Sequence, residues 1–197
     1  MSQPGLFAQP DVPLLDDASG QIRYVPGLLD ANRARQWFDT LQAQVPWKAQ
    51  RREMYGREVD VPRLLGSYRL GDPALPPVLR EAAELVRDVV DAPFDAVGLN
   101  LYRDQRDSVA PHNDHLYEIA AGQPIALLSL GATRRMTIRE KQPPRRVLDI
   151  DLEAGSLLVM SYETQLHYDH GVPKQRTPVG PRISLAFRVR PRTGGRY

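Results

Sequence analysis

The sequence predicts an α+β domain in which helices precede a jelly roll of short strands. Before residue 93, apolar residues recur every three or four positions, which is the spacing of one helical face. From Phe94 onward they alternate in short runs, separated by turns that contain glycine or proline. Helices followed by about six to eight short strands are typical of a jelly-roll core with helices on its N-terminal side.

Length and composition limit the class of protein. The 197 residues suffice for one domain with a full core, which we expect over residues 20–197. Residues 1–19 mix Pro, Gly and Asp and are expected to be a flexible N-terminal segment. The lack of cysteine excludes disulfides and thiol catalysis and suits a reducing, cytoplasmic location. No signal-peptide pattern or membrane-length apolar run is present, so we expect no membrane contact. We also expect a monomer.

The charge distribution permits a polyanionic partner. The formal net charge is +2 and the sequence pI is about 9.0. Basic residues outnumber acidic ones between Gly131 and Tyr197, and Lys and Arg bind nucleic acids by releasing counterions from phosphates. A solvated basic surface explains the same charge equally well.

The N-terminal elements are predicted to be a short strand and two helices. Ile22–Val25 alternates as a strand does, and Asp30 suits the N-cap of the helix that follows. The apolar positions of this helix share one face: Ala34, Trp37, Phe38, Leu41 and Val45. A second helix begins at Pro76-Pro77, which suits a first turn, and ends before Pro93. Its buried face is expected to comprise Val78, Leu79, Ala82, Leu85, Val86 and Val89.

Short strands are predicted for the rest of the chain. They are Phe94–Arg103, Ile125–Leu130, Met136–Arg139, Arg146–Leu152, Ser156–Met160 and Arg182–Val189. The last of these has two unlike faces. One face is apolar and should pack on the helices; it comprises Ile183, Leu185, Phe187 and Val189.

The other face of the last strand suits an anionic ligand. It carries Arg182, Ser184 and Arg188, which are a poor composition for an apolar core. A guanidinium holds a carboxylate through a planar, bidentate fork, so this face suits a dicarboxylate. The strand at Phe94–Arg103 shows the same division, because Asn100 and Tyr102 share its polar face.

The four histidines fall into two close pairs, His112/His115 and His167/His170. His112 and Asp114 are two residues apart, so in an extended chain both side chains point the same way. Two histidines and one carboxylate on one side of a metal, with open positions opposite, form the facial triad of non-haem Fe(II) oxygenases. The sequence therefore predicts an iron site that contains His112 and Asp114.

The third ligand of this site must come from a distant strand, and both His167 and His170 qualify. We favour His170, because the turn Gly171-Val172-Pro173 follows it and leads toward the strand that begins at Arg182. His167 is then expected to be a neighbour of the site.

Several motifs occur in a fixed order along the chain. They are Asn100-Leu101-Tyr102, His112-Asn113-Asp114, His170 and Arg182-Ile183-Ser184-Leu185-Ala186-Phe187-Arg188. In this order and spacing, from about residue 20 to 190, the chain resembles the AlkB family of Fe(II)- and 2-oxoglutarate-dependent nucleic-acid dealkylases. Pro62-Arg63 followed by Tyr68 also fits the spacing of that family.

The resemblance implies a double-stranded β-helix over about residues 94–190, with a nucleotide-recognition lid over about residues 46–75. It implies Fe(II) as the cofactor and 2-oxoglutarate and O₂ as co-substrates. The implied iron ligands are His112, Asp114 and His170. Arg182 would pair with the distal carboxylate of 2-oxoglutarate, helped by Tyr102. The rest of that pocket would be formed by Asn100, Ser184 and Arg188.

The resemblance also implies contacts to alkylated DNA or RNA. The segment Arg51–Arg57 resembles the tip of a lid hairpin, where Met54 or Tyr55 either fills the gap left by a flipped base or packs under the lid. Lys174 and Arg176 could contact phosphates. His115 stands where many family members carry an acid. The full set of candidate substrate contacts is Met54, Tyr55, Arg63, Tyr68, His115, Lys174 and Arg176.

Three functions compete. The first is oxidative demethylation of bases of the 1-methyladenine or 3-methylcytosine type in DNA or RNA, releasing an aldehyde, succinate and CO₂. The second is an Fe(II)/2-oxoglutarate oxygenase that hydroxylates or demethylates a protein or a small molecule, since His115 replaces the usual acid. The third is a nucleic-acid-binding protein with a degenerate site, against which the complete ligand set and the two arginines of the last strand argue.

Overall fold

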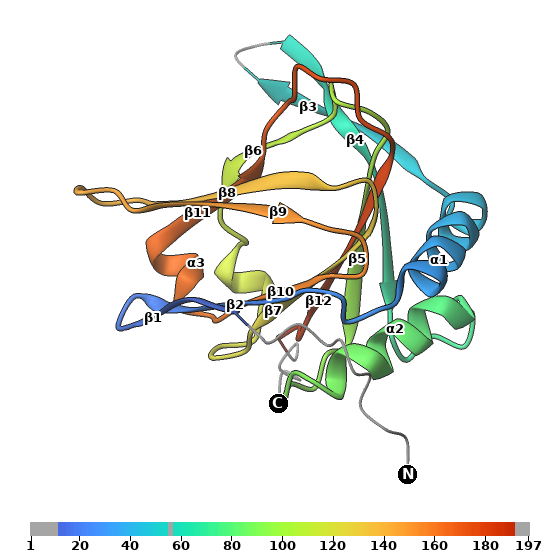
Figure 1. Cartoon of the computed structure of the whole chain (residues 1–197), viewed down its shortest axis with the longest axis horizontal. Helices are drawn as coiled ribbons and strands as arrows, with labels where there is room; N and C mark the ends of the chain where they lie inside the picture. Colours follow the sequence, from blue (N-terminus) through green and yellow to red (C-terminus); the bar gives the residue numbers. More distant parts are fainter. Residues whose placement is uncertain (1–11, 55–56, 192–197) are drawn as a thin grey trace, which may run out of the picture.

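Two antiparallel sheets form the fold in a computed structural model that describes residues 12–54 and 57–191 (Figure 1). The larger sheet has eight strands, in the order β1-β2-β10-β7-β12-β5-β4-β3. Their bounds are Val12–Asp17, Gly20–Val25, Leu157–Met160, Ile125–Gly131, Arg182–Arg188, Ala96–Tyr102, Arg57–Arg69 and Lys48–Met54. The smaller sheet has the order β6-β11-β8-β9, with bounds Val109–His112, Tyr168–Val172, Arg134–Glu140 and Val147–Leu152.

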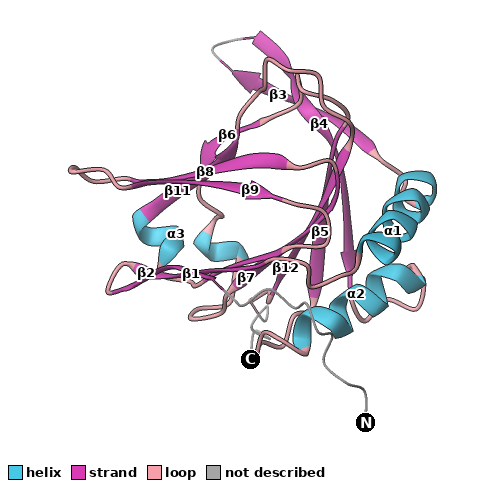
Figure 2. Ribbon diagram, in the orientation of Figure 1, coloured by secondary structure: helices cyan, strands magenta, loops and turns pink. Residues whose placement is uncertain are grey.

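Helices α1 (Ala31–Gln44) and α2 (Pro77–Arg87) cover the outer face of the larger sheet (Figure 2). The side chain of Asp30 accepts a hydrogen bond from the backbone N–H of Arg33, which confirms the predicted N-cap. The buried side chains of α1 are Ala34, Trp37, Phe38 and Leu41, and those of α2 are Leu79, Ala82, Ala83 and Val86. The amphipathic pattern thus places both helices where their apolar faces meet the sheet.

Strand β12 lies between β5 and β7 and separates two cores. Ile183, Leu185 and Phe187 are fully buried in the core shared with the helices, as the alternation predicted. Ala186 packs in a second core between the two sheets, together with Tyr102 of β5 and side chains of the smaller sheet. The jelly roll therefore has an apolar outer layer under the helices and an interior that is partly polar.

Outside the expected lid hairpin, three strands were not predicted. Val12–Asp17 forms β1, so the expected flexible segment over residues 1–19 is wrong for this part; residues 1–11 lie outside the described residues. Leu15 is 5% exposed, and the strand pairs with β2. Strand β1 lies at the edge of the sheet, where Pro13 is tolerated beside a register shift. Strands β6 and β11 lack apolar alternation because they carry His112 and His170.

The region expected as a lid contains a long hairpin. Strands β3 and β4 pair from Lys48 with Leu65 to Met54 with Arg57. The far end of this hairpin extends beyond the rest of the larger sheet at the top of Figure 1. Within the described part of the chain, no helix combines the length and the apolar character needed to cross a membrane.

Candidate metal centre

Three side chains suited to metal binding meet beside the smaller sheet. His112 ends β6, and His170 of β11 lies opposite it in the strand register. Asp114 follows in the loop that leads to the short 3-10 turn η1 (Leu116–Glu118). One ligand atom from each of His112, Asp114 and His170 lies within 4.8 Å of the others. His167, the alternative third ligand, lies outside this cluster and is exposed at the end of α3 (Thr164–His167).

Gly171 lets the two histidine-bearing strands approach each other. A Cβ at this position would lie 2.9 Å from the carbonyl oxygen of Val109 and 3.0 Å from the backbone nitrogen of Pro111. Any larger residue would therefore push β11 away from β6. The glycine that follows His170 is a requirement of the metal-ligand geometry.

The hydrogen bond of His112 and the burial of His170 both suit metal binding. Nδ1 of His112 lies 2.9 Å from the carbonyl oxygen of Ala110, so it donates a hydrogen bond there and leaves the lone pair of Nε2 free. His170 is 7% exposed, and burial lowers its pKa to about 4. Its imidazole is thus neutral at neutral pH, as metal binding requires. The two ring centroids are 4.6 Å apart.

Asp114 is fixed by two residues that lie far away in the sequence. Its backbone N–H donates to Oε1 of Gln165 at 3.0 Å. Nε and Nη2 of Arg188 lie 2.7 and 2.6 Å from Oδ2. Burial raises the pKa of Asp114, but the positive charge and hydrogen bond of Arg188, together with the two histidines, outweigh burial and hold the pKa below its usual value. Oδ1 lies 4.0 Å from Nε2 of His112 and is the oxygen that faces the histidines.

Arg182 lies at the other end of β12, on the same face as Arg188. Its side chain is fully buried, and Nη2 donates to Oγ of Ser129 at 2.8 Å. Nε and Nη1 have no hydrogen-bond partner among the described residues. Burial lowers the pKa of Arg182. Free guanidinium donors in a buried position favour an anionic ligand, because unpaired buried donors are costly.

Comparisons with known proteins identify the family of this site. The model of the 2OG-Fe(II) oxygenase superfamily matches residues 21–188. Alpha-ketoglutarate-dependent dioxygenase alkB homolog 3 of Homo sapiens is 30% identical over 198 residues, which cover 91% of this chain and 69% of that protein. The chain belongs to the AlkB family of 2OG-Fe(II) oxygenases.

Further AlkB relatives agree with this assignment. DNA oxidative demethylase ALKBH2 of Bos taurus is 33% identical over 157 residues, which cover 69% of this chain and 56% of that protein. The chain spans between 56% and 69% of the length of the curated relatives it matches. The solved structure of OsALKBH1 shares the fold, with a TM-score of 0.60 at 14% identity over 85% of this chain and 96% of that one.

The AlkB-family cofactor and co-substrates, Fe(II), 2-oxoglutarate and O₂, fit the residues present. His112, Asp114 and His170 supply two imidazoles and a carboxylate within reach of one ion. The buried, unpaired donors of Arg182 suit an anionic group such as a carboxylate of 2-oxoglutarate. Both groups of residues line the interior side of the jelly roll.

The other predicted pocket residues lie on this interior face of the sheet. Ser184 pairs with Asn100 on one side and with Ser129 on the other. Tyr102 pairs with Arg182, whose Cζ lies 5.4 Å from the centroid of its ring. Arg188 differs from the prediction in its contact, because it pairs with Asp114.

The structure places Tyr68, a candidate substrate contact, away from the metal centre, and it places Arg63 on the interior side of the sheet. Tyr68 pairs with Val97, and it packs against the core on the helix side of the sheet. It therefore faces away from the metal centre, because side chains alternate between the faces of a strand. Arg63 lies on the interior side, where its Nε donates to Oδ1 of Asn100 at 2.8 Å.

The remaining candidate contacts lie at the surface or outside the described region. His115, Lys174 and Arg176 are exposed. Met54 is the last residue of β3, but its side chain is not among those described, and Tyr55 lies outside the described residues. The ring of His115 stacks on that of Tyr117, with centroids 5.1 Å apart. His115 is the residue noted in the sequence as standing where many members of the AlkB family carry an acid.

Two residues near the site were missed by the sequence analysis. Gln165 is 1% exposed and binds the backbone of Asp114; Arg134 is fully buried and contacts Tyr102. Gln165 lies in a four-residue helix, and no periodicity marks it. Arg134 precedes the predicted strand and reads as one more basic residue of the C-terminal half. Only the fold shows what either contacts.

Proposed function

We propose that this chain is a dioxygenase that oxidatively demethylates N-alkylated bases, of the 1-methyladenine or 3-methylcytosine type, in DNA or RNA. The observation that supports it most is a single interior face that holds the His112, Asp114 and His170 cluster at one end and the free donors of Arg182 at the other. The similarity to the DNA oxidative demethylase ALKBH2 of Bos taurus supports the substrate class. The cysteine-free sequence supports a cytoplasmic location, and we expect a monomer.

Each residue of the centre has a distinct part in this proposal. Nε2 of His112, the imidazole of His170 and Oδ1 of Asp114 hold one side of the metal, while Arg188 keeps Oδ2 engaged. Arg182 orients 2-oxoglutarate through the distal carboxylate. When bound, iron and 2-oxoglutarate supply the oxidation by O₂ that releases the alkyl group as an aldehyde, with succinate and CO₂ as co-products.

The substrate has to reach the centre from outside the jelly roll. A base in a duplex must leave its stack before its alkyl group can approach a buried metal. The hairpin β3–β4 is the element we propose to contact the displaced base or its gap, through Met54, Tyr55 and Arg63. The exposed Lys174 and Arg176 lie in the loop after β11 and are proposed to bind phosphates.

The test is succinate release by the purified protein with Fe(II) and 2-oxoglutarate. Oligonucleotides with and without 1-methyladenine or 3-methylcytosine are compared, in single- and double-stranded form, and loss of the methyl group is followed by mass spectrometry. We expect succinate release to rise with a methylated oligonucleotide and one aldehyde to form for each methyl group lost. Succinate release that no methylated oligonucleotide stimulates would refute base demethylation.

One observation favours a second candidate function. The stacked pair of His115 and Tyr117 replaces the expected acid, and Tyr117 is 75% exposed. An exposed aromatic pair also suits a protein side chain or a planar small molecule. The alternative is therefore an oxygenase for such a substrate. Basal succinate release that methylated oligonucleotides leave unchanged and a peptide or small-molecule substrate stimulates would support it.

A further inference from the structure

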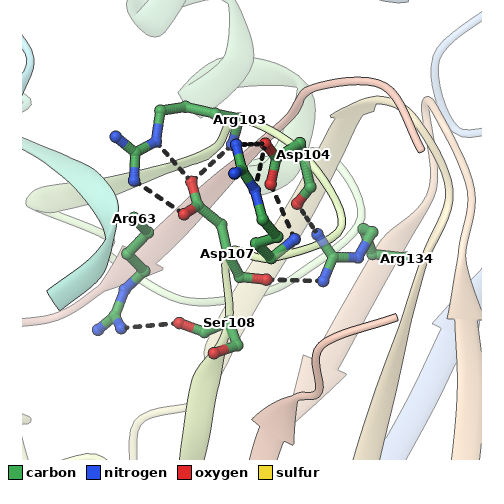
Figure 3. A network of polar contacts seen from close by, with 7 residues as sticks. Arg63, Arg103, Asp104, Asp107, Ser108 and Arg134 are labelled. Atoms are coloured by element: carbon green, nitrogen blue, oxygen red, sulfur yellow. Dashed lines mark hydrogen bonds and ion pairs between the residues drawn. The ribbon is translucent and has the colours of Figure 1, made fainter. Parts of the chain in front are cut away.

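Arg134 is a buried cation whose role the proposed function does not explain. It is the first residue of β8 and is fully buried, whereas the next residue, Arg135, is exposed and pairs with Asp151. The Arg134 guanidinium donates to three backbone carbonyls, those of Asp104 at 3.0 Å, Asp107 at 2.8 Å and Pro173 at 2.9 Å. Figure 3 shows the first two of these bonds. Its Nε has no hydrogen-bond partner among the described residues.

These carbonyls belong to the two loops next to β6 and β11, the strands that carry His112 and His170. Asp104 and Asp107 lie between β5 and β6, and Pro173 directly follows β11. The carboxylates near Arg134 are already engaged: Asp107 binds Arg103 and Asp104 binds Arg106, as Figure 3 shows for Asp107. Arg134 therefore bonds to neutral groups only. A purely structural tie between two loops does not require a buried positive charge.

A second buried guanidinium, that of Arg182, contacts the same ring of Tyr102 as Arg134 does. Cζ of Arg134 lies 5.5 Å from the centroid of this ring, and Cζ of Arg182 lies 5.4 Å from it. Two buried guanidinium groups thus share one phenol ring, and neither contacts a carboxylate among the described residues. Burying two like charges without an anion is costly. A bound carboxylate at the free donors of Arg182 would offset that cost for both.

We propose that Arg134 is a positioning residue for the distal carboxylate of 2-oxoglutarate. It holds Tyr102 against Arg182 by cation–π contact and adds a second buried positive charge beside the pocket. It acts through Tyr102 and Arg182, and its own guanidinium stays on the loop carbonyls. The proposal rests on the proposed function only in taking Arg182 as the carboxylate-binding residue.

The test compares Arg134→Met and Arg134→Lys with Arg135→Met, a matched change at the neighbouring, exposed arginine. The full chain is loaded with Mn(II) in place of Fe(II), without nucleic acid. Calorimetry gives the dissociation constants of Mn(II), of 2-oxoglutarate and of 2-oxopentanoate, which has the same chain length but lacks the distal carboxylate. Because no nucleic acid is present, failure of base demethylation does not affect the result.

We expect Arg134→Met to weaken 2-oxoglutarate binding about tenfold, the effect of one desolvated cation–π contact. Mn(II) and 2-oxopentanoate should bind as in the unmodified protein. Arg134→Lys keeps the charge but loses the planar group, so a smaller loss of about threefold is expected. Arg135→Met should change nothing. Equal weakening of all three ligands, no change in any of them, or failure of both Arg134 variants to fold would make Arg134 a structural tie and overturn the proposal.

Discussion

The buried residues of the interior face, here called the pocket, and the exposed residues of the adjoining loops, here called the rim, are built differently. In the pocket, Arg182 is fully buried, His170 is 7% exposed and Asp114 is held by both Gln165 and Arg188. At the rim, His115, Lys174 and Arg176 are exposed, and Tyr117 is 75% exposed. The pocket residues lie on strands or beside them, whereas the rim residues lie in loops and in the turn η1.

This difference separates the chemistry from the choice of substrate. A metal centre needs ligands held within a fraction of an ångström, and burial with several contacts provides this. Exposed loop residues can be exchanged without disturbing the core, so specificity can change at the rim while the pocket stays the same. Changes in the pocket should therefore affect metal or 2-oxoglutarate binding, and changes at the rim should affect nucleic-acid binding alone.

The largest effect is expected from Asp114→Ala. The change removes the only carboxylate of the metal cluster and leaves the partly buried Arg188 without this partner. Metal affinity and turnover should fall by more than about a hundredfold, the upper end of what the loss of an outer-shell partner costs. Mn(II) titration and succinate release measure this. Asp39→Ala, at an exposed position of α1, is the control. Unchanged metal binding in Asp114→Ala would show that the centre is misassigned.

The second-largest effect is expected from His170→Ala, and His167→Ala is its matched comparison. His170 lies in the ligand cluster, whereas His167 is exposed and outside it. We expect His170→Ala to abolish measurable turnover and His167→Ala to keep it within about twofold, as for a surface change. Both variants are compared by Mn(II) affinity and by succinate release. The reverse order would assign the third ligand to His167.

Gln165→Ala should weaken the centre without destroying it. The amide binds the backbone of Asp114, so its loss frees the loop that carries this carboxylate. Loss of such a supporting contact typically costs about 10- to 100-fold in metal affinity. Mn(II) titration measures the loss, and Gln44→Ala, at an exposed end of α1, is the control. An unchanged Mn(II) affinity would mean that Arg188 alone orients Asp114.

Period-two alternation in the sequence was enough to predict both faces of β12. It placed Ile183 and Phe187 toward the helices and Arg182 on the polar face, because side-chain direction in a strand follows from position alone. The spacing of His112 and Asp114 predicted their convergence, although Asp114 lies in the loop after β6 and not on the strand. The choice of His170 over His167 rested on a turn predicted at Gly171, but Gly171 and Val172 belong to β11, and Gly171 serves the close approach of β11 to β6.

What the sequence could not show are contacts between segments far apart in the chain. Arg188 was expected in the 2-oxoglutarate pocket, but it pairs with Asp114, 74 positions away. Gln165 reaches Asp114 from α3, 51 positions away. Tyr68 was expected near the substrate, but the register of β4 turns it toward the helices. Such outcomes depend on strand register and loop closure, which local patterns do not encode.

The smallest effect is expected at the rim, from the double change Lys174→Ala with Arg176→Ala. If both residues bind phosphates, affinity for an oligonucleotide falls and the slope of log K against log salt concentration decreases by about one unit per residue. Fluorescence anisotropy at several salt concentrations measures this. The control, Arg35→Ala with Arg80→Ala, removes the same charge from exposed positions on the helices. Affinity for 2-oxoglutarate should stay unchanged in both double variants. If the control lowers the slope equally, net charge explains binding, and the loop after β11 has no specific part in it. If the affinity for 2-oxoglutarate also falls, pocket and rim are not independent.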